Sequence, residues 1–189
     1  MIRTARLLLR QWRPEDREPF AAMGQDPAVM EYFPSLLSRS DSDAGADRAE
    51  AGIAQNGFGF WAVEIPGEAP FAGFIGLNRP RFETHFTPCI EIGWRLARPF
   101  WGCGYATEGA AAALDFGFNN LGLEEIVSFA VVDNARSMAV MRRIGMTYSE
   151  QFDHPDLEKG HRLRRHVLYR ISKSGWRQIS PAVPVGGGL

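Results

Sequence analysis

The sequence predicts a mixed α/β domain, in which helices cover both faces of a central twisted sheet of about seven strands. Two observations lead to this prediction. Short segments rich in β-branched and aromatic residues are interleaved with longer segments in which small and apolar residues recur at helical spacing. The later part of the chain follows the order strand, helix, strand, helix, strand, strand, which is typical of a mixed sheet covered by helices.

Size and charge narrow the classes of protein to which the chain can belong. It has 189 residues, a length at which one domain buries roughly 70% of its unfolded surface without disulfides or structural metals. A formal net charge of −1 gives no overall attraction to nucleic acid or to an anionic membrane, so neither partner is expected. No apolar run approaches the ~20 residues that a membrane-spanning helix needs.

The two ends of the chain and its cysteines indicate whether a signal peptide is present and in which compartment the protein is expected. Met1–Arg10 has no continuous apolar core, so it is not expected to be a signal peptide. Cys89 and Cys103 form no CxxC pair, and a reducing cytoplasm is the simplest setting for them. We expect one domain over residues 1–173 and a Pro/Gly-rich, weakly ordered tail over residues 174–189.

The first third of the chain predicts one strand and several helices. Leu7–Leu9 favours a short strand. A helix is expected from Pro14, because proline suits the first turn and the acids after it suit the positive end of the helix dipole. Asp26 is expected to cap a short segment over residues 28–33, and a partly exposed helix is expected within residues 38–55.

The rest of the chain predicts alternating strands and two further helices. Apolar and aromatic segments bounded by turn residues predict strands over residues 58–65, 71–77, 89–96, 126–132, 147–152 and 165–172. Small residues at helical spacing predict a helix over residues 106–120 that can lie close to a sheet. The last helix is expected to begin at the cap Asn134 and to end before Gly145.

The strongest functional signal is the loop before the helix at 106–120. Gly102 and Gly104 precede this helix at once, so their backbone N–H groups are free to bind an anion at the positive end of its dipole. The alternative is a tight turn, which glycine serves equally well. The loop matches neither GxGxxG nor GxxxxGK[ST], which argues against a dinucleotide fingerprint and a P-loop.

The segment Trp101-Gly102-Cys103-Gly104-Tyr105-Ala106 matches the pattern [Q/R]-x-x-G-x-[G/A] at Gly104 and Ala106, with Trp101 in the first place. That pattern is the acyl-CoA loop of the GNAT superfamily, which the chain resembles. The tryptophan is typical of the branch that contains ribosomal-protein alanine N-acetyltransferases. Further agreement with that branch lies in residues 4–10, 26–30, 91–94 and 134–146, and the similarity spans residues 2–172.

The resemblance implies a sheet that splays between two parallel strands, here those at 90–96 and 126–132, with the pantetheine arm of acetyl-CoA in the gap. A backbone N–H near Trp94 or Arg95 would then bind the oxyanion, and those of residues 102–107 the pyrophosphate. The full set of implied acetyl-CoA contacts is Trp94, Arg95, Leu96, Arg98, Trp101, Gly102, Cys103, Gly104, Tyr105, Ala106, Thr107, Asn134 and Ser137.

The catalytic candidates are Ser137 and Glu91. Many GNAT enzymes have a tyrosine acid at the position that matches Met141, so Ser137 becomes the candidate acid, although a capping role beside Asn134 would also explain it. Glu91 either lines the acceptor cleft or pairs with an arginine. His166 is either a structural histidine or a base, and a water chain could replace a dedicated base.

No metal site is predicted, because the spacing of His154, Asp156, His161 and His166 matches no zinc pattern. The resemblance implies an N-acetyltransferase that moves an acetyl group from acetyl-CoA to a primary amine in a ternary complex. The acceptor would be a protein N-terminus or a small amine, and the protein a monomer or homodimer. The alternative is an acyl-CoA-binding regulatory protein with little turnover, which the missing tyrosine motivates.

Overall fold

The structure is a computed structural model that describes residues 1–179, and its strands form one sheet in the order β1-β2-β3-β4-β5-β6-β8-β7. The strands are β1 (Ile2–Arg3), β2 (Leu8–Arg10), β3 (Phe60–Ile65), β4 (Ala69–Asn78), β5 (Glu91–Leu96), β6 (Glu125–Val131), β7 (Thr147–Asp153) and β8 (Arg165–Ser172). Neighbouring strands pair antiparallel except β5 and β6, which are parallel. The predicted mixed α/β fold is confirmed.

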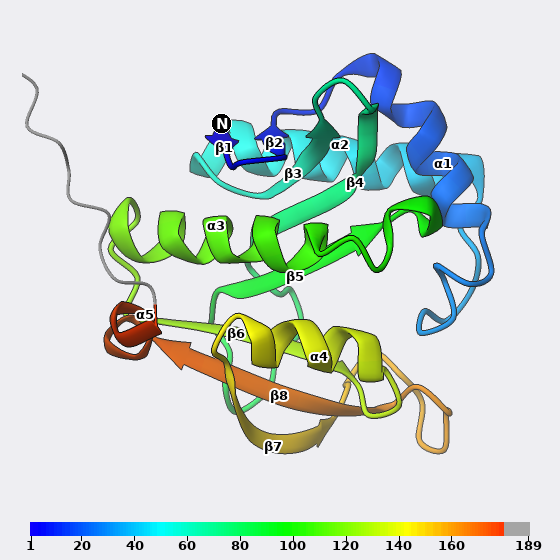
Figure 1. The fold of residues 1–189 in the computed structure, drawn as a ribbon. Coiled ribbons are helices and arrows are strands. Elements are labelled where there is room, and N and C mark those ends of the chain that lie inside the picture. The colour runs from blue at the N-terminus through cyan, green and yellow to red at the C-terminus, as the bar shows by residue number, and fades with distance from the viewer. Residues whose placement is uncertain (180–189) are drawn as a thin grey trace, which may run out of the picture.

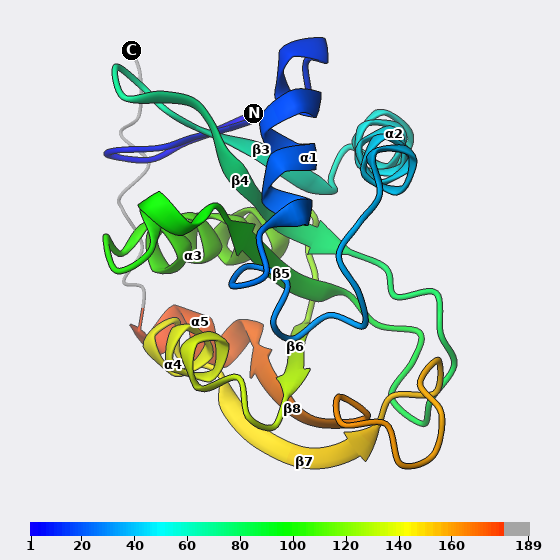
Figure 2. The same ribbon diagram turned by 90° about the vertical axis from the view of Figure 1, so that its right-hand side faces the viewer.

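Helices cover both faces of this sheet. They are α1 (Arg17–Gln25), α2 (Arg39–Asn56), α3 (Tyr105–Asn119), α4 (Ala135–Arg143) and α5 (Lys173–Ile179), with 3₁₀ turns at Pro14–Asp16 and Arg98–Phe100. Helices α3, α4 and α5 lie on the face toward the viewer in Figure 1, and Figure 2 shows α1 and α2 on the opposite side. The parallel pair β5 and β6 lies in the middle of the sheet and is covered by α3 and α4, whereas α1 and α2 pack on β4 and β3.

The small residues of α3 allow it to lie close to the sheet, as predicted. A Cβ atom added at Gly109 would come within 2.5 Å of the Ile75 side chain, and one at Gly117 within 2.7 Å of Ile126. Larger residues would push α3 outward. The position of the loop that precedes α3 is therefore fixed by how closely this helix packs on β4 and β6.

Two elements differ from the prediction, and a third, the expected helix within residues 38–55, is present. Strand β1 adds an eighth strand, which at two residues is too short to show an alternating pattern. Residues 28–33 form turns rather than a helix, because the Asp26 side chain and carbonyl accept the N–H groups of Ala28 (2.8 Å) and Met30 (3.0 Å) in a local turn. The helix within residues 38–55 begins directly after Ser38, whose hydroxyl accepts the Asp41 N–H at 3.1 Å.

The tail expected from Ser174 starts as a helix. Its Trp176 is buried against Phe118, with ring centroids 6.4 Å apart, and its indole N–H donates to Asp115 at 3.3 Å. Burial of this aromatic side chain offsets the entropy cost of ordering the segment. The rest of the predicted tail, residues 180–189, lies outside the described residues. Within residues 1–179, no helix has the length and apolar character needed to cross a membrane.

Candidate active site

Strands β5 and β6 separate just after they begin to pair. Their register joins only Glu91 with Val127, where the Val127 N–H donates to the Ile90 carbonyl at 2.9 Å. The next carbonyl along this edge, that of Ile92, accepts the Ser128 hydroxyl at 2.9 Å instead of a backbone N–H. Beyond this point the strands diverge and leave the gap that the resemblance implies.

Strand alternation decides which backbone groups face the gap. The carbonyls of Ile90 and Ile92 point toward β6, whereas the Ala97 N–H donates across to β4, at the carbonyl of Ala72. Because the N–H and C=O of successive residues point to opposite edges of a strand, those of Trp94 face the gap and those of Arg95 face β4. Trp94 is therefore the better placed of the two candidate oxyanion donors.

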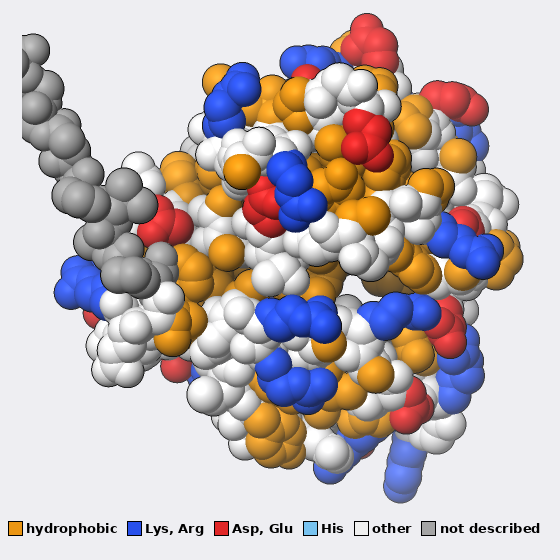
Figure 3. Space-filling model, viewed as in Figure 1, with side chains coloured by type: hydrophobic (Ala, Val, Ile, Leu, Met, Phe, Trp, Pro, Cys, Tyr) orange, Lys and Arg blue, Asp and Glu red, His pale blue; other side chains and the backbone are white. Residues whose placement is uncertain are grey.

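Two cavities adjoin this gap. A cavity of about 520 Å³, here called the loop-side cavity, reaches Gly102 and Ala106 and is walled by α4. A second cavity of about 460 Å³, here called the histidine-side cavity, reaches His154 and His166. Both are lined by Tyr32, Phe33, Trp94, Arg95, Asn134 and Ser137. The two cavities therefore meet at the gap, and Figure 3 shows a hollow with Lys or Arg side chains beside it.

The loop-side cavity has the groups that a pyrophosphate needs. Gly102 and Gly104 have φ values of 75° and 82°, which turn the chain so that no N–H from Gly102 to Thr107 donates within the described residues. The first bonded N–H is that of Glu108, which donates to the Gly104 carbonyl at 3.0 Å. Free N–H groups at the start of α3 form an anion cradle. Arg136 and Arg143 line the same cavity from α4.

The N-terminal segment holds this loop in place. Glu108, in the first turn of α3, accepts the Arg6 guanidinium at 2.7 Å and the Thr4 hydroxyl at 2.6 Å. Arg6 also donates to the Cys103 carbonyl at 3.0 Å. Thr4 and Arg6 belong to the segment 4–10, which the sequence showed only as a short motif shared with the family. Their contacts position the cradle.

Most of the residues predicted to contact acetyl-CoA line the loop-side cavity, but some of them do not. The residues that line it are Trp94, Arg95, Leu96, Trp101, Gly102, Ala106, Asn134 and Ser137. Cys103, Gly104 and Thr107 do not line it, and they offer only the N–H groups of the cradle. The indole N–H of Trp101 donates to the Leu96 carbonyl at 2.7 Å, and Arg136 lies 4.6 Å above its ring.

Two of the residues predicted to contact acetyl-CoA, Tyr105 and Arg98, line neither cavity. Tyr105 is buried, because its position at the start of α3 turns it toward the core, where its hydroxyl lies 3.2 Å from Glu68. Arg98 is exposed on its 3₁₀ turn and lines neither cavity. A contact of either side chain with acetyl-CoA stays a prediction.

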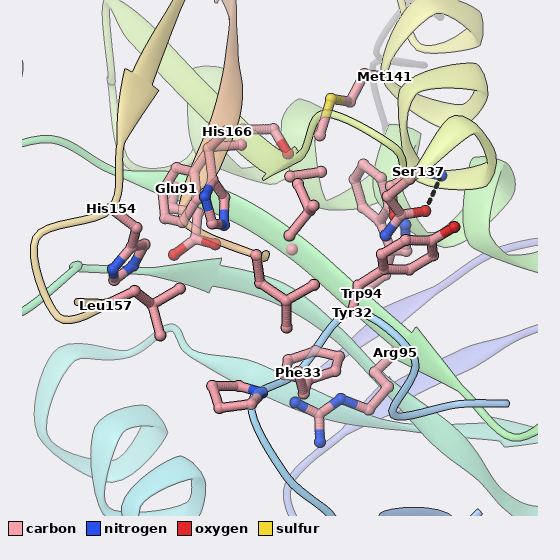
Figure 4. Close-up of a pocket in the computed structure, with 18 of the residues that line it drawn as sticks. Tyr32, Phe33, Glu91, Trp94, Arg95, Ser137, Met141, His154, Leu157 and His166 are labelled. Atoms are coloured by element: carbon pink, nitrogen blue, oxygen red, sulfur yellow. Dashed lines mark hydrogen bonds between the residues drawn. The ribbon is translucent and has the colours of Figure 1, made fainter. Parts of the chain in front are cut away.

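The positions of Asn134 and Ser137 are compatible both with capping of α4 and with a place at the proposed reaction site. The Asn134 side-chain oxygen accepts the Ser137 N–H at 3.0 Å, which caps α4 and appears as the dashed line in Figure 4. Both residues also line both cavities. Within residues 1–179 the Ser137 hydroxyl makes no hydrogen bond, so it is free to donate a proton. Met141, one turn further along α4, is buried at the wall of the histidine-side cavity.

Glu91 faces the histidine-side cavity rather than an arginine partner. Burial raises the pKa of its carboxyl to about 8, and a hydrogen bond from Asn78 lowers the pKa only in part. The carboxyl group therefore holds its proton at neutral pH. In Figure 4 it lies at the same end of the cavity as His154 and His166.

The two histidines of this cavity are neutral and have opposite tautomers. Burial lowers the pKa of both His154 and His166, whose rings lie 5.1 Å apart. His154 Nδ1 accepts the Asp156 N–H at 3.3 Å, which leaves the proton on Nε2. His166 Nδ1 lies 3.1 Å from the Arg164 carbonyl, so it carries the proton and Nε2 keeps a free lone pair. His166 can therefore accept a proton.

Sequence reasoning missed the aromatic pair Tyr32 and Phe33, which lines both cavities from the turn after α1. The Tyr32 hydroxyl donates to the Asp133 carbonyl at 3.1 Å. Two aromatics followed by Pro34, directly before a polar segment, were the only signal available. Among residues 1–179, no three His, Cys, Asp or Glu side chains gather as they would around a metal ion.

A family model described as an acetyltransferase (GNAT) domain matches residues 6–147. The chain belongs to this family. The resemblance of the loop at 101–106 is thereby confirmed, and the protein is a GNAT acetyltransferase.

Relatives and solved structures agree with this assignment. FsC-acetyl coenzyme A-N(2)-transacetylase of Aspergillus fumigatus is 31% identical over 196 residues, which cover 94% of this chain and 78% of that protein. The acetyltransferase (GNAT family) from Bacillus anthracis has a TM-score of 0.76 and 26% identity, covering 92% of this chain and 98% of its own. A putative ribosomal-protein-serine acetyltransferase from Vibrio cholerae shares the fold, with a TM-score of 0.73 and 15% identity over 90% and 96% of the two chains.

Proposed function

We propose that this GNAT acetyltransferase moves the acetyl group of acetyl-CoA to a primary amine, by direct attack in a ternary complex. The observation that carries the proposal is the gap between β5 and β6, where the two cavities meet beside Trp94 and Ser137. Substrates that enter from the two sides would come together at this point. The name of the A. fumigatus relative, a transacetylase of acetyl coenzyme A, supports the donor.

Each group of the loop-side cavity has a part in holding the donor. The free N–H groups of residues 102–107 bind the pyrophosphate, and Arg136 and Arg143 add positive charge from α4. Acetyl-CoA supplies an acyl group activated by its thiolate leaving group. The backbone N–H of Trp94 points into the gap and polarises the thioester carbonyl, a contribution of about 3 kcal/mol in other acyl-transfer sites.

The transfer needs two proton movements. His166 Nε2 takes the proton that the attacking amine loses, as the new C–N bond forms and the C–S bond breaks. Ser137 Oγ gives its proton to the departing thiolate and regains one from solvent. Tyr32 and Phe33 line both cavities at the gap, where their rings would exclude bulk water from the thioester.

The acceptor is a small amine or a protein N-terminus, and we place the reaction in the cytoplasm because Cys89 and Cys103 are free thiols. Release of free CoA thiol from acetyl-CoA, measured with a panel of amines, tests the function. Amine-dependent release is expected. Micromolar CoA binding with no release for any amine would instead favour the acyl-CoA-binding regulatory protein.

Replacing Ser137 with Ala should lower kcat by about 10- to 100-fold and leave the Kd for CoA within about threefold. The backbone N–H that Asn134 caps is kept, so the melting temperature should not change. Steady-state kinetics and calorimetric titration with CoA measure the two effects. Equal losses in turnover and affinity would show that Ser137 only supports the helix. Tyr32→Phe is the comparison that tests whether the neighbouring hydroxyl is the acid instead.

Replacing His166 with Asn should lower kcat/KM by about 100-fold and remove one ionisation from the acid limb of its pH profile. Asn keeps a donor near the Arg164 carbonyl but lacks the lone pair of Nε2. His161→Asn is the matched control, because His161 lines neither cavity. An unchanged pH profile in His166→Asn would indicate that water, not His166, accepts the proton.

A further inference from the structure

Arg95 is a partly buried cation that lines both cavities and has no partner within residues 1–179. Its Nε is buried without a hydrogen-bond acceptor, and within residues 1–179 the guanidinium forms no salt bridge. Burial lowers the pKa of Arg95 to about 10, so the side chain still carries its charge at neutral pH. An unpaired buried charge is costly, and such groups are normally paired with an anion.

Two aromatic rings hold the guanidinium without neutralising it. It lies 3.9 Å from the centre of the Phe33 ring and 5.3 Å from that of Phe74. Cation–π contacts of this kind orient a guanidinium plane but leave its N–H donors unused. Figure 4 shows Arg95 beside Phe33 at the end of the site away from His154. A planar anion at this place could accept two of those donors at once.

No acid of the site can serve as that anion. Glu91 lies four residues away on β5, about 13 Å along an extended strand, and its carboxyl is protonated at neutral pH. Asp156 lies in the loop between β7 and β8 at the histidine end of the cavity. The guanidinium is therefore available to a bound anion.

Arg95 lines both cavities, but its contacts with Phe33 and Phe74 place its side chain apart from the anion cradle. Its side chain packs on Phe33 and Phe74, on the face of the sheet that α1 and α2 cover, whereas the anion cradle opens from α3 on the other face. The free N–H groups of the cradle and Arg143 of α4 face the loop-side cavity, together with Arg136, which also pairs with Glu31 at 2.6 Å. Arg95 also follows directly after Trp94 in β5, and both residues line both cavities, so a ligand on Arg95 would lie beside the gap.

From these contacts we infer that the acceptor is a free amino acid or a similar small amino carboxylate, whose carboxylate binds the Arg95 guanidinium while its amine faces the gap. The inference rests on the proposed acetyl transfer and specifies its substrate. A polyamine would place positive charge against Arg95, and a protein N-terminus has an amide where this site needs a carboxylate.

Thiol release at saturating acetyl-CoA tests the inference with the twenty common amino acids and their primary amides. At least one free acid should be acetylated with a KM about 50-fold below that of its amide, the difference expected for charge-assisted hydrogen bonds. Arg95→Met should raise the KM of the acid about 50-fold and abolish the preference for the acid over its amide. Arg79→Met is the matched control, since Arg79 also lies over an aromatic ring but lines neither cavity.

Two results would overturn the inference while leaving acetyl transfer intact: turnover of amides or polyamines in preference to free acids, or an acid KM that Arg95→Met leaves unchanged. Failure of every amine to release thiol would instead count against the proposed function. In that case calorimetric titration of the CoA-loaded protein with the amino acids and their N-acetyl derivatives decides the role of Arg95. Binding that Arg95→Met weakens supports the anion site, and absence of binding rules it out.

Discussion

Gly102→Trp should reduce the affinity for CoA at least 100-fold, to the point where calorimetric titration detects no binding. A Cβ atom at Gly102 would meet nothing within 4 Å, and the residue lines the loop-side cavity, so an indole ring would extend into the space proposed for the pyrophosphate. The φ of 75° would also strain any L side chain and turn the N–H groups of the cradle. The indole ring and the altered backbone would therefore both weaken binding of the CoA pyrophosphate.

The control for this variant is Gly122→Trp. Gly122 has a φ of 69° and also has nothing within 4 Å of an added Cβ, but it lies after α3 and lines neither cavity. The two substitutions therefore impose similar backbone strain, and only the first fills the site. Comparable CoA affinity in both variants would show that the cradle is wrongly placed, whereas loss only in Gly102→Trp supports it.

Glu91 should make the protein less stable as the pH rises. The pKa of its carboxyl is raised from 4.5 to about 8 in the folded protein. Between these values the folded state holds a proton that the unfolded state has lost, so stability present below pH 4.5 is lost as the pH rises through 8. The integrated effect is about 5 kcal/mol. Glu91→Gln cannot ionise and should be more stable than the wild type at pH 9 by about that amount.

Urea unfolding of both proteins at pH 5 and pH 9 measures this difference. Glu108→Gln provides a comparison of opposite sign. Burial raises the pKa of Glu108, but hydrogen bonds from Thr4 and Arg6 outweigh it and lower the pKa overall, so this carboxylate stabilises the fold above its unfolded pKa. Its loss should destabilise the protein at both pH values. A Glu91→Gln variant that gains nothing at pH 9 would mean that the carboxyl is solvated.

Local signals explain why the cradle was predicted from the sequence. Gly102 and Gly104 require a backbone that other residues avoid, and the small residues of α3 indicate close packing, so both features depend on neighbours in the chain. The turn at residues 28–33 was mispredicted for a related reason. Its Asp26-Pro27 start resembles a helix cap, but the structure resolves it as a local turn that carries Tyr32 and Phe33 to the site.

The sequence by itself determined the mixed α/β class, the family and the loop that begins α3, because each depends on short-range patterning or on a motif. Only the tertiary structure decided that Trp94 faces the gap, that Tyr105 turns into the core, and that Arg95 lies unpaired between Phe33 and Phe74. These outcomes depend on strand register and on whether side chains from distant segments form hydrogen bonds or ion pairs with the residue. Burial and charge pairing arise between segments far apart in the chain, and no local pattern encodes them.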